Sequence, residues 1–113
     1  MKNGYELLST LTNTLDSSSN IISKITSYSK NDFAKDEEAI NISIGLVSEV
    51  GNILNCIDDE LLFLSATLRE LIIPIKEYAN NMLNKYKFVN AYKLYDCICI
   101  DICNLKECLD SLK

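Results

Sequence analysis

The apolar residues of this chain recur at alternating spacings of three and four, which is the period of an amphipathic α-helix. The first stripe predicts a helix over residues 5–28 and consists of Leu8, Leu11, Leu15, Ser18, Ile22 and Ile25. The remaining positions of this segment are mostly Ser, Thr and Asn, which are mediocre helix formers. We therefore expect this helix to depend on packing more than the others do.

A second helix is predicted after a connection at residues 29–35. Asp36 suits the N-cap position, and Glu37 and Glu38 lie where the helix dipole favours negative charge. The apolar stripe that follows consists of Ala39, Ile42, Leu46, Val50, Ile53 and Ile57. The cap and the stripe together predict a helix that begins at residue 37 and ends near residue 57.

Two glycines lie inside this second helix. Gly45 and Gly51 each cost about 1 kcal/mol relative to Ala in a helix interior. Gly45 flanks the apolar stripe, so the close approach of another helix would explain it. The pattern offers no such explanation for Gly51.

Two further stripes complete the chain. A helix that starts at residues 58–60 is predicted from Leu61, Leu64, Leu68, Leu71, Ile75, Ala79 and Met82. Pro74 lies inside this helix, lacks a backbone donor and clashes with the preceding turn, so we expect a kink or break near residues 71–73. A last helix at about residues 89–112 follows from Ala91, Leu94, Ile98, Ile102, Leu105, Leu109 and Leu112.

Residues 39–58 can be laid over residues 91–110 without a gap. The identical pairs are Ala39/Ala91, Asn52/Asn104, Cys56/Cys108 and Asp58/Asp110. Each segment follows another helical stretch, so we predict two related helical hairpins. Three Gly and one Pro in 113 residues disfavour a many-stranded sheet. The predicted fold is therefore a single all-α domain over residues 1–113, an antiparallel up-down four-helix bundle.

Composition narrows the classes of function. The formal net charge is −5, and of 11 Lys and Arg residues only Arg69 is an arginine, which disfavours nucleic-acid binding. The first residues contain no apolar leader, and the apolar run around residues 71–75 is too short to span a bilayer. Five cysteines without a visible secretory signal indicate a reducing compartment. We therefore expect a cytoplasmic protein without a membrane or nucleic-acid partner.

Four cysteines close together invite a metal-site hypothesis. Cys97, Cys99, Cys103 and Cys108 lie on one predicted helix, where they cannot all point at one ion, and the chain contains no His. The lack of His also removes the commonest general acid and base, and there is no Gly-rich phosphate loop or Ser-centred elbow. We therefore expect no metal, no cofactor and no small-molecule substrate, and we predict that the protein is not an enzyme.

Glu49 and Asp101 occupy equivalent places in the two repeated segments, each beside its apolar stripe. A carboxylate at a core boundary usually caps a helix or pairs with Lys. The alternative is a paired acidic site for a partner. Without a His or a Glu-x-x-His motif, the two carboxylates do not make a di-iron site.

The third helix carries more apolar residues than one stripe accounts for. Leu62, Phe63, Ile72 and Ile73 cannot all face the same core as the stripe, and Ile100 lies opposite the seam of the last helix. Either helix crossing and the proline kink bury them, or they form a patch for another protein. The predicted partner-binding residues are Leu62, Phe63, Ile73 and Ile100.

The run from Leu94 to Ile102, together with Ile44, Gly45 and Leu46, resembles segments of small helical proteins of unknown function that are encoded near flagellar genes in low-GC Gram-positive bacteria. The resemblance extends over about half of the chain, and this sequence departs from it in its cysteines and in lacking a later Pro and Trp. It implies a non-enzymatic helical-bundle accessory protein, such as a chaperone or scaffold.

Our leading hypothesis is a protein-interaction module (a chaperone, scaffold or adaptor) that presents an apolar helix face to a protein partner. One alternative is a phage- or plasmid-type inhibitor or immunity protein whose acidic surface blocks a basic site on its target. Another is a redox sensor in which oxidation of Cys99 or Cys103 links two chains into a homodimer. Salt dependence of binding separates the first two, because apolar contacts are less sensitive to salt.

Overall fold

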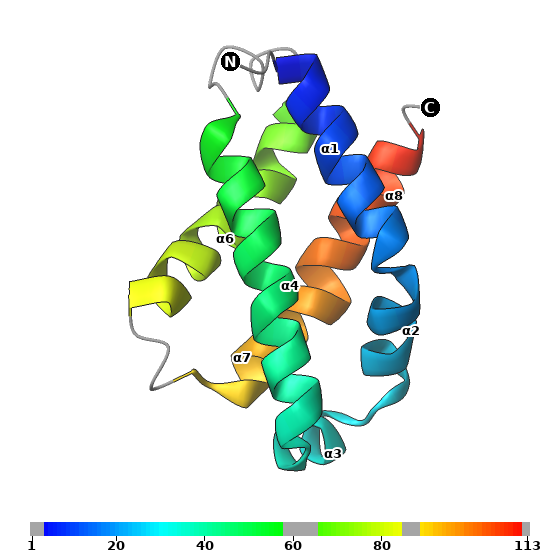
Figure 1. Ribbon diagram of the computed structural model, residues 1–113, viewed down its shortest axis with the longest axis vertical. Helices are drawn as coiled ribbons and strands as arrows, with labels where there is room; N and C mark the ends of the chain where they lie inside the picture. Colours follow the sequence, from blue (N-terminus) through cyan, green and yellow to red (C-terminus); the bar gives the residue numbers. More distant parts are fainter. Residues whose placement is uncertain (1–3, 58–65, 85–88, 112–113) are drawn as a thin grey trace.

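The computed structural model describes residues 4–57, 66–84 and 89–111, and its regular structure in these ranges is entirely helical (Figure 1). The prediction of an all-α fold is confirmed. In chain order the elements are α1 (Gly4–Ser17), α2 (Ser19–Ser27), α3 (Lys30–Lys35), α4 (Glu37–Cys56), α6 (Ala66–Asn84), α7 (Ala91–Asp96), the π-helical segment η2 (Cys97–Ile102) and α8 (Cys103–Ser111).

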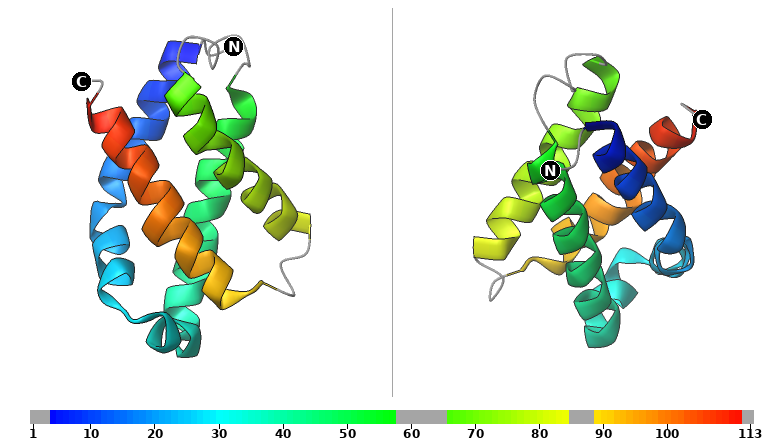
Figure 2. Two further views of the ribbon diagram at one scale, coloured as in Figure 1. Left: turned by 180° about the vertical axis from the view of Figure 1, so that it is seen from behind. Right: turned by 45° about the horizontal axis from the view of Figure 1, so that its top comes forward.

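The central element is α4, which contacts α1, α3, α6 and α7. Figure 1 shows α1 and α2 running from one end of the molecule to the other, where α3 turns the chain into α4. Seen from behind in Figure 2, α7, η2 and α8 follow one another as a single rod. This rod contacts α6 and the α1–α2 pair, so the core is enclosed from several sides.

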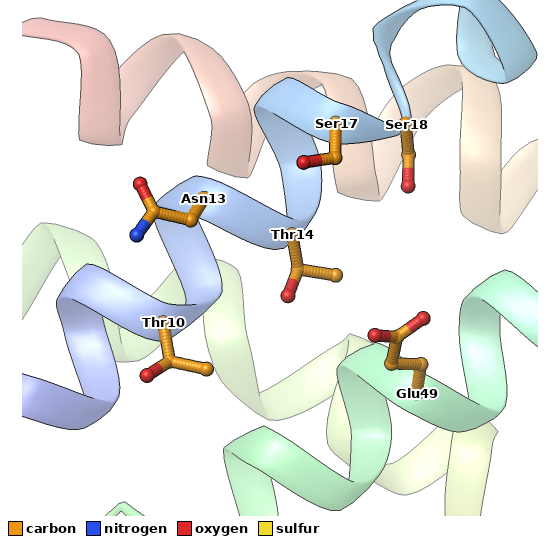
Figure 3. A pocket seen from close by; sticks show the side chains of 6 residues that line it. All are labelled: Thr10, Asn13, Thr14, Ser17, Ser18 and Glu49. Atoms are coloured by element: carbon orange, nitrogen blue, oxygen red, sulfur yellow. The ribbon is translucent and has the colours of Figure 1, made fainter.

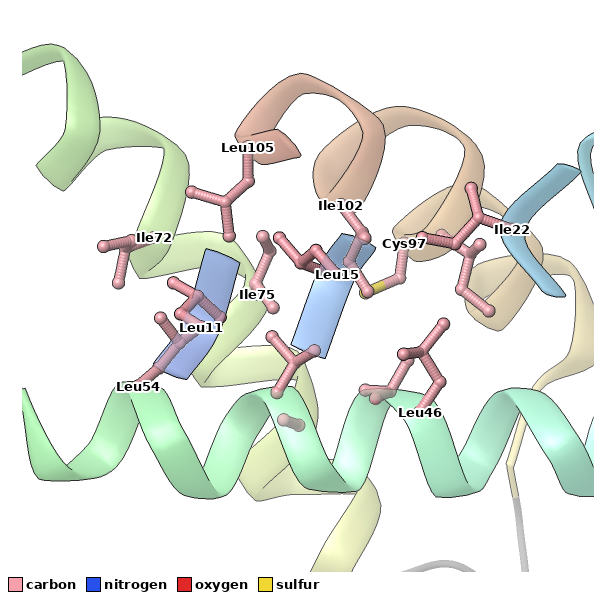
Figure 4. Close-up of a cluster of buried hydrophobic side chains, with 14 of the residues drawn as sticks. Leu11, Leu15, Ile22, Leu46, Leu54, Ile72, Ile75, Cys97, Ile102 and Leu105 are labelled. Carbon is pink, nitrogen blue, oxygen red and sulfur yellow. The ribbon is translucent and has the colours of Figure 1, made fainter. Parts of the chain in front are cut away.

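The core is one cluster of buried apolar side chains, mostly aliphatic, to which each of the elements α1, α2, α3, α4, α6, α7, η2 and α8 contributes. Figure 4 shows these side chains converging between the helices. The largest that are fully buried include Phe33, Leu11, Leu15, Ile25, Leu54, Ile72, Ile75, Leu94, Ile98, Ile102 and Leu105. Most of them belong to the predicted stripes, so the helical period identified the core correctly.

The helix predicted over residues 5–28 is divided in two at Ser18. The backbone of Ser18 has φ −95° and ψ 6°, and α2 begins at the next residue. The hydroxyl of Ser19 donates to the carbonyl oxygen of Asp16 at 2.7 Å. Serine side chains that bond to nearby carbonyls compete with the helical ladder, and Ser19 supplies this competition here.

The connection predicted at residues 29–35 is wrong, because α3 is a short helix. Ser29 is its N-cap, and its hydroxyl accepts a hydrogen bond from the amide of Asp32 at 3.1 Å. Phe33 is completely buried and its ring lies 5.5 Å from that of Tyr95, measured between centroids. A helix of six residues is too short to display a stripe, so the sequence pattern did not reveal it.

Side-chain contacts hold α3 and its flanks against α7. Lys30 forms an ion pair with Asp96 at 2.8 Å. The hydroxyl of Tyr92 donates to Asn31 Oδ1 at 3.1 Å, and that of Tyr95 donates to the carbonyl oxygen of Tyr28 at 2.7 Å. We call this set of contacts the α3–α7 corner.

The predicted N-cap of α4 is confirmed. Asp36 Oδ1 accepts a hydrogen bond from the amide of Ala39 at 3.1 Å, and Asp36 Oδ2 accepts one from the hydroxyl of Tyr28 at 2.6 Å. The Tyr28 hydrogen bond is the largest cause that lowers the pKa of Asp36, followed by the Ala39 amide. One carboxylate therefore caps α4 and ties it to the end of α2.

The explanations expected for the two glycines of α4 are reversed. A Cβ atom at Gly45 would have nothing within 4 Å, whereas one at Gly51 would lie 2.5 Å from the Cβ of Ala79. Of these two glycines, Gly51 is therefore the one at which α6 lies close to α4. One turn away, Asn55 and Asn80 exchange hydrogen bonds of 2.8 and 3.3 Å between their side-chain amides.

Of the predicted kink or break at Pro74, the break is wrong, since α6 continues from Ala66 to Asn84, and the kink stays a prediction. Ile72 and Ile75 are fully buried on either side of the proline, so packing holds the helix together there. The predicted start of this helix at residues 58–60 lies outside the described residues. In the described ranges, α4 is the helix that is long and apolar enough to cross a membrane, a property that core helices share.

The last predicted helix is present but not uniform. Asn90 is its N-cap, and its side chain accepts hydrogen bonds from the amides of Tyr92 and Lys93 at 2.9 and 3.3 Å. The six residues of η2 then have π-helical hydrogen bonding before α8 begins at Cys103. Nothing in the apolar period of the sequence indicated this wider turn.

Candidate functional site

The described partner-binding candidates are both exposed. Ile73 on α6 is 39% exposed and Ile100 in η2 is 54% exposed. The elements α6 and η2 contact each other. Ile72, which shared the apolar excess of this helix, is fully buried. Leu62 and Phe63 lie outside the described residues.

One residue assigned to the core stripe of α4 is instead exposed. Ile42 is 37% exposed, while the neighbouring Ser43 is completely buried. The hydroxyl of Ser43 donates to the carbonyl oxygen of Ala39 at 2.7 Å, which satisfies the buried polar group. The buried face of α4 is therefore rotated at this position relative to the predicted stripe, and Ile42 joins Ile21 and Tyr92 as an exposed apolar residue.

A polar pocket lies between α1 and the middle of α4 (Figure 3). It has a volume of about 280 Å³ and is lined by Thr10, Asn13, Thr14, Ser17, Ser18 and Glu49. Sequence reasoning singled out Glu49 but missed the pocket. The sequence signal for the pocket is the Ser, Thr and Asn content of the first predicted helix. These residues lower helix propensity, but they also supply the polar groups that line the pocket.

The two carboxylates at equivalent repeat positions have different surroundings. Glu49 is exposed and lines the polar pocket, whereas Asp101 is half-buried in η2 and does not line it. Burial, and then the neighbouring charge of Asp96, raises the pKa of Asp101. The predicted alternative of one paired acidic site gains no support from these positions.

The described cysteines are all free, and three have environments that oppose thiolate formation. Burial, with a smaller contribution from Asp101, raises the pKa of Cys97 to about 12. Burial is also the main cause that raises the pKa values of Cys99 and Cys103. A reactive thiol needs the opposite shift. In the part of the chain that the structure describes, no group of three or more Cys, His, Asp or Glu side chains could hold a metal ion.

Comparison with known proteins adds no relative to this picture. No family model, curated protein or solved structure matches the chain. Function is therefore inferred from the fold and from its surfaces.

Proposed function

We propose that this chain is a non-enzymatic interaction module that binds a protein partner through an apolar helix surface containing Ile73 and Ile100. The carrying observation is the exposure of Ile100, 54%, within a π-helical segment. Isoleucine is among the residues most often buried, and π-helical turns occur frequently at functional sites. An exposed isoleucine at such a turn is a natural contact for a partner helix.

Two further features support this proposal. Ile73 is exposed on α6, the helix that contacts η2, so exposed apolar side chains occur on neighbouring elements. The resemblance of residues 94–102 to small helical accessory proteins points in the same direction. Leu62 and Phe63 are additional candidates for the same surface.

The test compares two pairs of exposed isoleucines. The tagged protein is used to capture partners from reducing host lysate, and the retained proteins are identified by mass spectrometry. The double variant Ile73→Ser/Ile100→Ser is expected to retain at least tenfold less of a stoichiometric partner. The matched control Ile21→Ser/Ile42→Ser, whose side chains are each 37% exposed, should retain it fully. Equal capture by both variants would contradict the proposed surface.

A second candidate function is an acidic inhibitor that covers a basic site on a target protein. The supporting observation is that α1 and α4 contain no Lys or Arg, but together carry Glu6, Asp16, Glu37, Glu38 and Glu49. An electrostatic complex of this kind dissociates at high salt, whereas an apolar one persists. Washing the captured partner with 0.05 M and then with about 1 M salt distinguishes the two functions.

We also infer that the fold is an up-down four-helix bundle built from two related hairpins. The helix of each repeated segment begins directly after a side-chain N-cap, Asp36 for α4 and Asn90 for α7. Several equivalent residues are buried in both segments: Leu46 and Ile98, Val50 and Ile102, and Ile57 and Leu109. The π-helical segment is then a feature of the second copy, since α4 is α-helical throughout.

A further inference from the structure

The polar pocket contains a carboxylate that has no partner among the residues that the structure describes. Glu49 forms no hydrogen bond or ion pair with any other described residue. Figure 3 shows its carboxylate pointing toward α1 and the hydroxyl group of Ser18 pointing toward it, whereas Thr14 turns its methyl group toward Glu49. No hydrogen bond joins these three side chains. The space between them is therefore bordered by oxygen atoms from both helices.

The break between α1 and α2 contributes to this arrangement. Thr10 and Thr12 donate their hydroxyls to carbonyl oxygens one turn earlier, both at 2.9 Å, and Ser19 donates to Asp16. The hydroxyls of Thr14 and Ser18 make no such bond within the described residues. Ser18, although only 9% exposed, therefore keeps its hydroxyl available to a group in the pocket.

The surroundings of the pocket favour a cation. None of its six lining residues is basic, and neither α1 nor α4 contains a Lys or Arg. The nearby Asp16 has a basic neighbour in Lys106, with 3.8 Å between Lys106 Nζ and Asp16 Oδ1. Lys106 does not line the pocket. Since no basic side chain of the described residues pairs with Glu49, its negative charge is available to a cation from solution.

The number and kind of polar groups select among cations. Ca²⁺ and Mg²⁺ require about six oxygen ligands, usually with several carboxylates, and the pocket offers one carboxylate. A primary ammonium has three donors and no acceptor. It can therefore donate to the carboxylate of Glu49 and to neutral oxygen atoms of the lining, such as the hydroxyl of Ser18.

We propose that the pocket between α1 and α4 binds an alkylammonium group, with the carboxylate of Glu49 and the hydroxyl of Ser18 as hydrogen-bond acceptors. Two sources carry this group: a free diamine, and a lysine side chain of a peptide or protein. The site is open to solvent, so the affinity of a single ammonium is expected in the millimolar range, on the order of 1–10 mM. This inference is independent of the apolar surface at Ile73 and Ile100.

Binding is tested by titrating the ¹⁵N-labelled full chain at low ionic strength with 1,5-diaminopentane, followed by amide chemical shifts. Saturable shifts are expected at Thr14, Ser18 and Glu49, and the uncharged 1,5-pentanediol should cause none. Glu49→Gln should weaken binding at least tenfold, and Ser18→Ala should weaken it about threefold, as expected for one hydrogen bond. The control Glu77→Gln removes an exposed carboxylate on α6 and should change nothing.

The outcomes separate the proposal from general charge screening. Shifts that persist in Glu49→Gln, that spread evenly over acidic residues, or that are missing altogether would overturn it. Spectra of Glu49→Gln that superimpose on the unmodified protein away from the pocket show that the variant is folded. Parallel titration with Nα-acetyl-lysine methylamide identifies the source, since tighter binding of this compound indicates a peptide-borne lysine and tighter binding of the diamine indicates a free amine.

Discussion

At the scale of single residues, a missing methyl group sets how closely α4 approaches α6. Gly51 allows the approach because a Cβ atom there would lie 2.5 Å from the Cβ of Ala79. The same residue type has no such role at Gly45, where a Cβ atom would have open space. Sequence reasoning assigned these roles in reverse, because it judged each glycine by its distance from the apolar stripe. Contact between two helices depends on both sequences, and the position of Ala79 on α6 could not be read from α4.

The two glycines give a matched pair of substitutions. Gly51→Ala should destabilise the protein by about 1–3 kcal/mol, because overpacking outweighs the gain in helix propensity. Gly45→Ala should stabilise it by about 1 kcal/mol, since only the propensity changes. Urea denaturation followed by circular dichroism measures both values. Stabilisation by Gly51→Ala would show that the helices can separate without cost.

At the scale of helices, the apolar period predicted the long helices but not the short local features between and within them. The stripe and the acidic cap predicted α4 to within a residue at each end. The break at Ser18, the short helix α3 and the π-helical turns of η2 leave no mark on a period of three to four. The break and α3 depend on side-chain hydrogen bonds of Ser19 and Ser29 and on the burial of Phe33. The polar pocket was missed for the same reason, because it exists only where α1 lies beside α4.

The hydrogen bond between Tyr28 and Asp36 makes the junction of α2 and α4 sensitive to acid. Because the folded protein lowers the pKa of Asp36, its stabilisation is present above the ordinary value of 3.8 and is lost as pH falls through the folded value. Tyr28→Phe should therefore reduce stability at pH 7, and the deficit should shrink toward pH 2–3. Thermal unfolding across this range measures the deficit.

Tyr92→Phe provides the control for this measurement. Its hydroxyl donates to Asn31, an amide that does not titrate, so its deficit should be independent of pH. If the deficits of the two variants respond equally to pH, the carboxylate of Asp36 is not responsible.

At the scale of the whole molecule, the buried thiol of Cys97 makes the free energy of unfolding depend on pH in the alkaline range. Its folded pKa of about 12 exceeds the ordinary value of 9.0, so the unfolded chain releases a proton first. The resulting stability is complete below pH 9 and falls as pH rises toward 12, by about 1.4 kcal/mol per pH unit. Burial also raises the pKa of Tyr78 from 10.0 to about 12, which adds to the loss above pH 10.

Cys97→Ala should make this alkaline profile less steep between pH 9 and 10, although the lost side-chain volume lowers stability at every pH. Cys56→Ala removes an exposed thiol and should keep the profile of the unmodified protein. Urea denaturation at several pH values measures the slope for both variants. An unchanged slope in Cys97→Ala would mean that this thiol ionises equally in the folded and unfolded states.

The α3–α7 corner has a consequence for the order in which the molecule forms. Its two hydrogen bonds connect residues 61 and 67 positions apart in the chain, Tyr92 with Asn31 and Tyr95 with Tyr28. Contacts so distant in sequence carry a high loop-closure cost and tend to slow folding. During synthesis, α3 is made long before α7. The contact between the rings of Phe33 and Tyr95 therefore cannot form until most of the chain has been synthesised. The α3–α7 corner can therefore be completed only after α7 has been synthesised and has packed against α3.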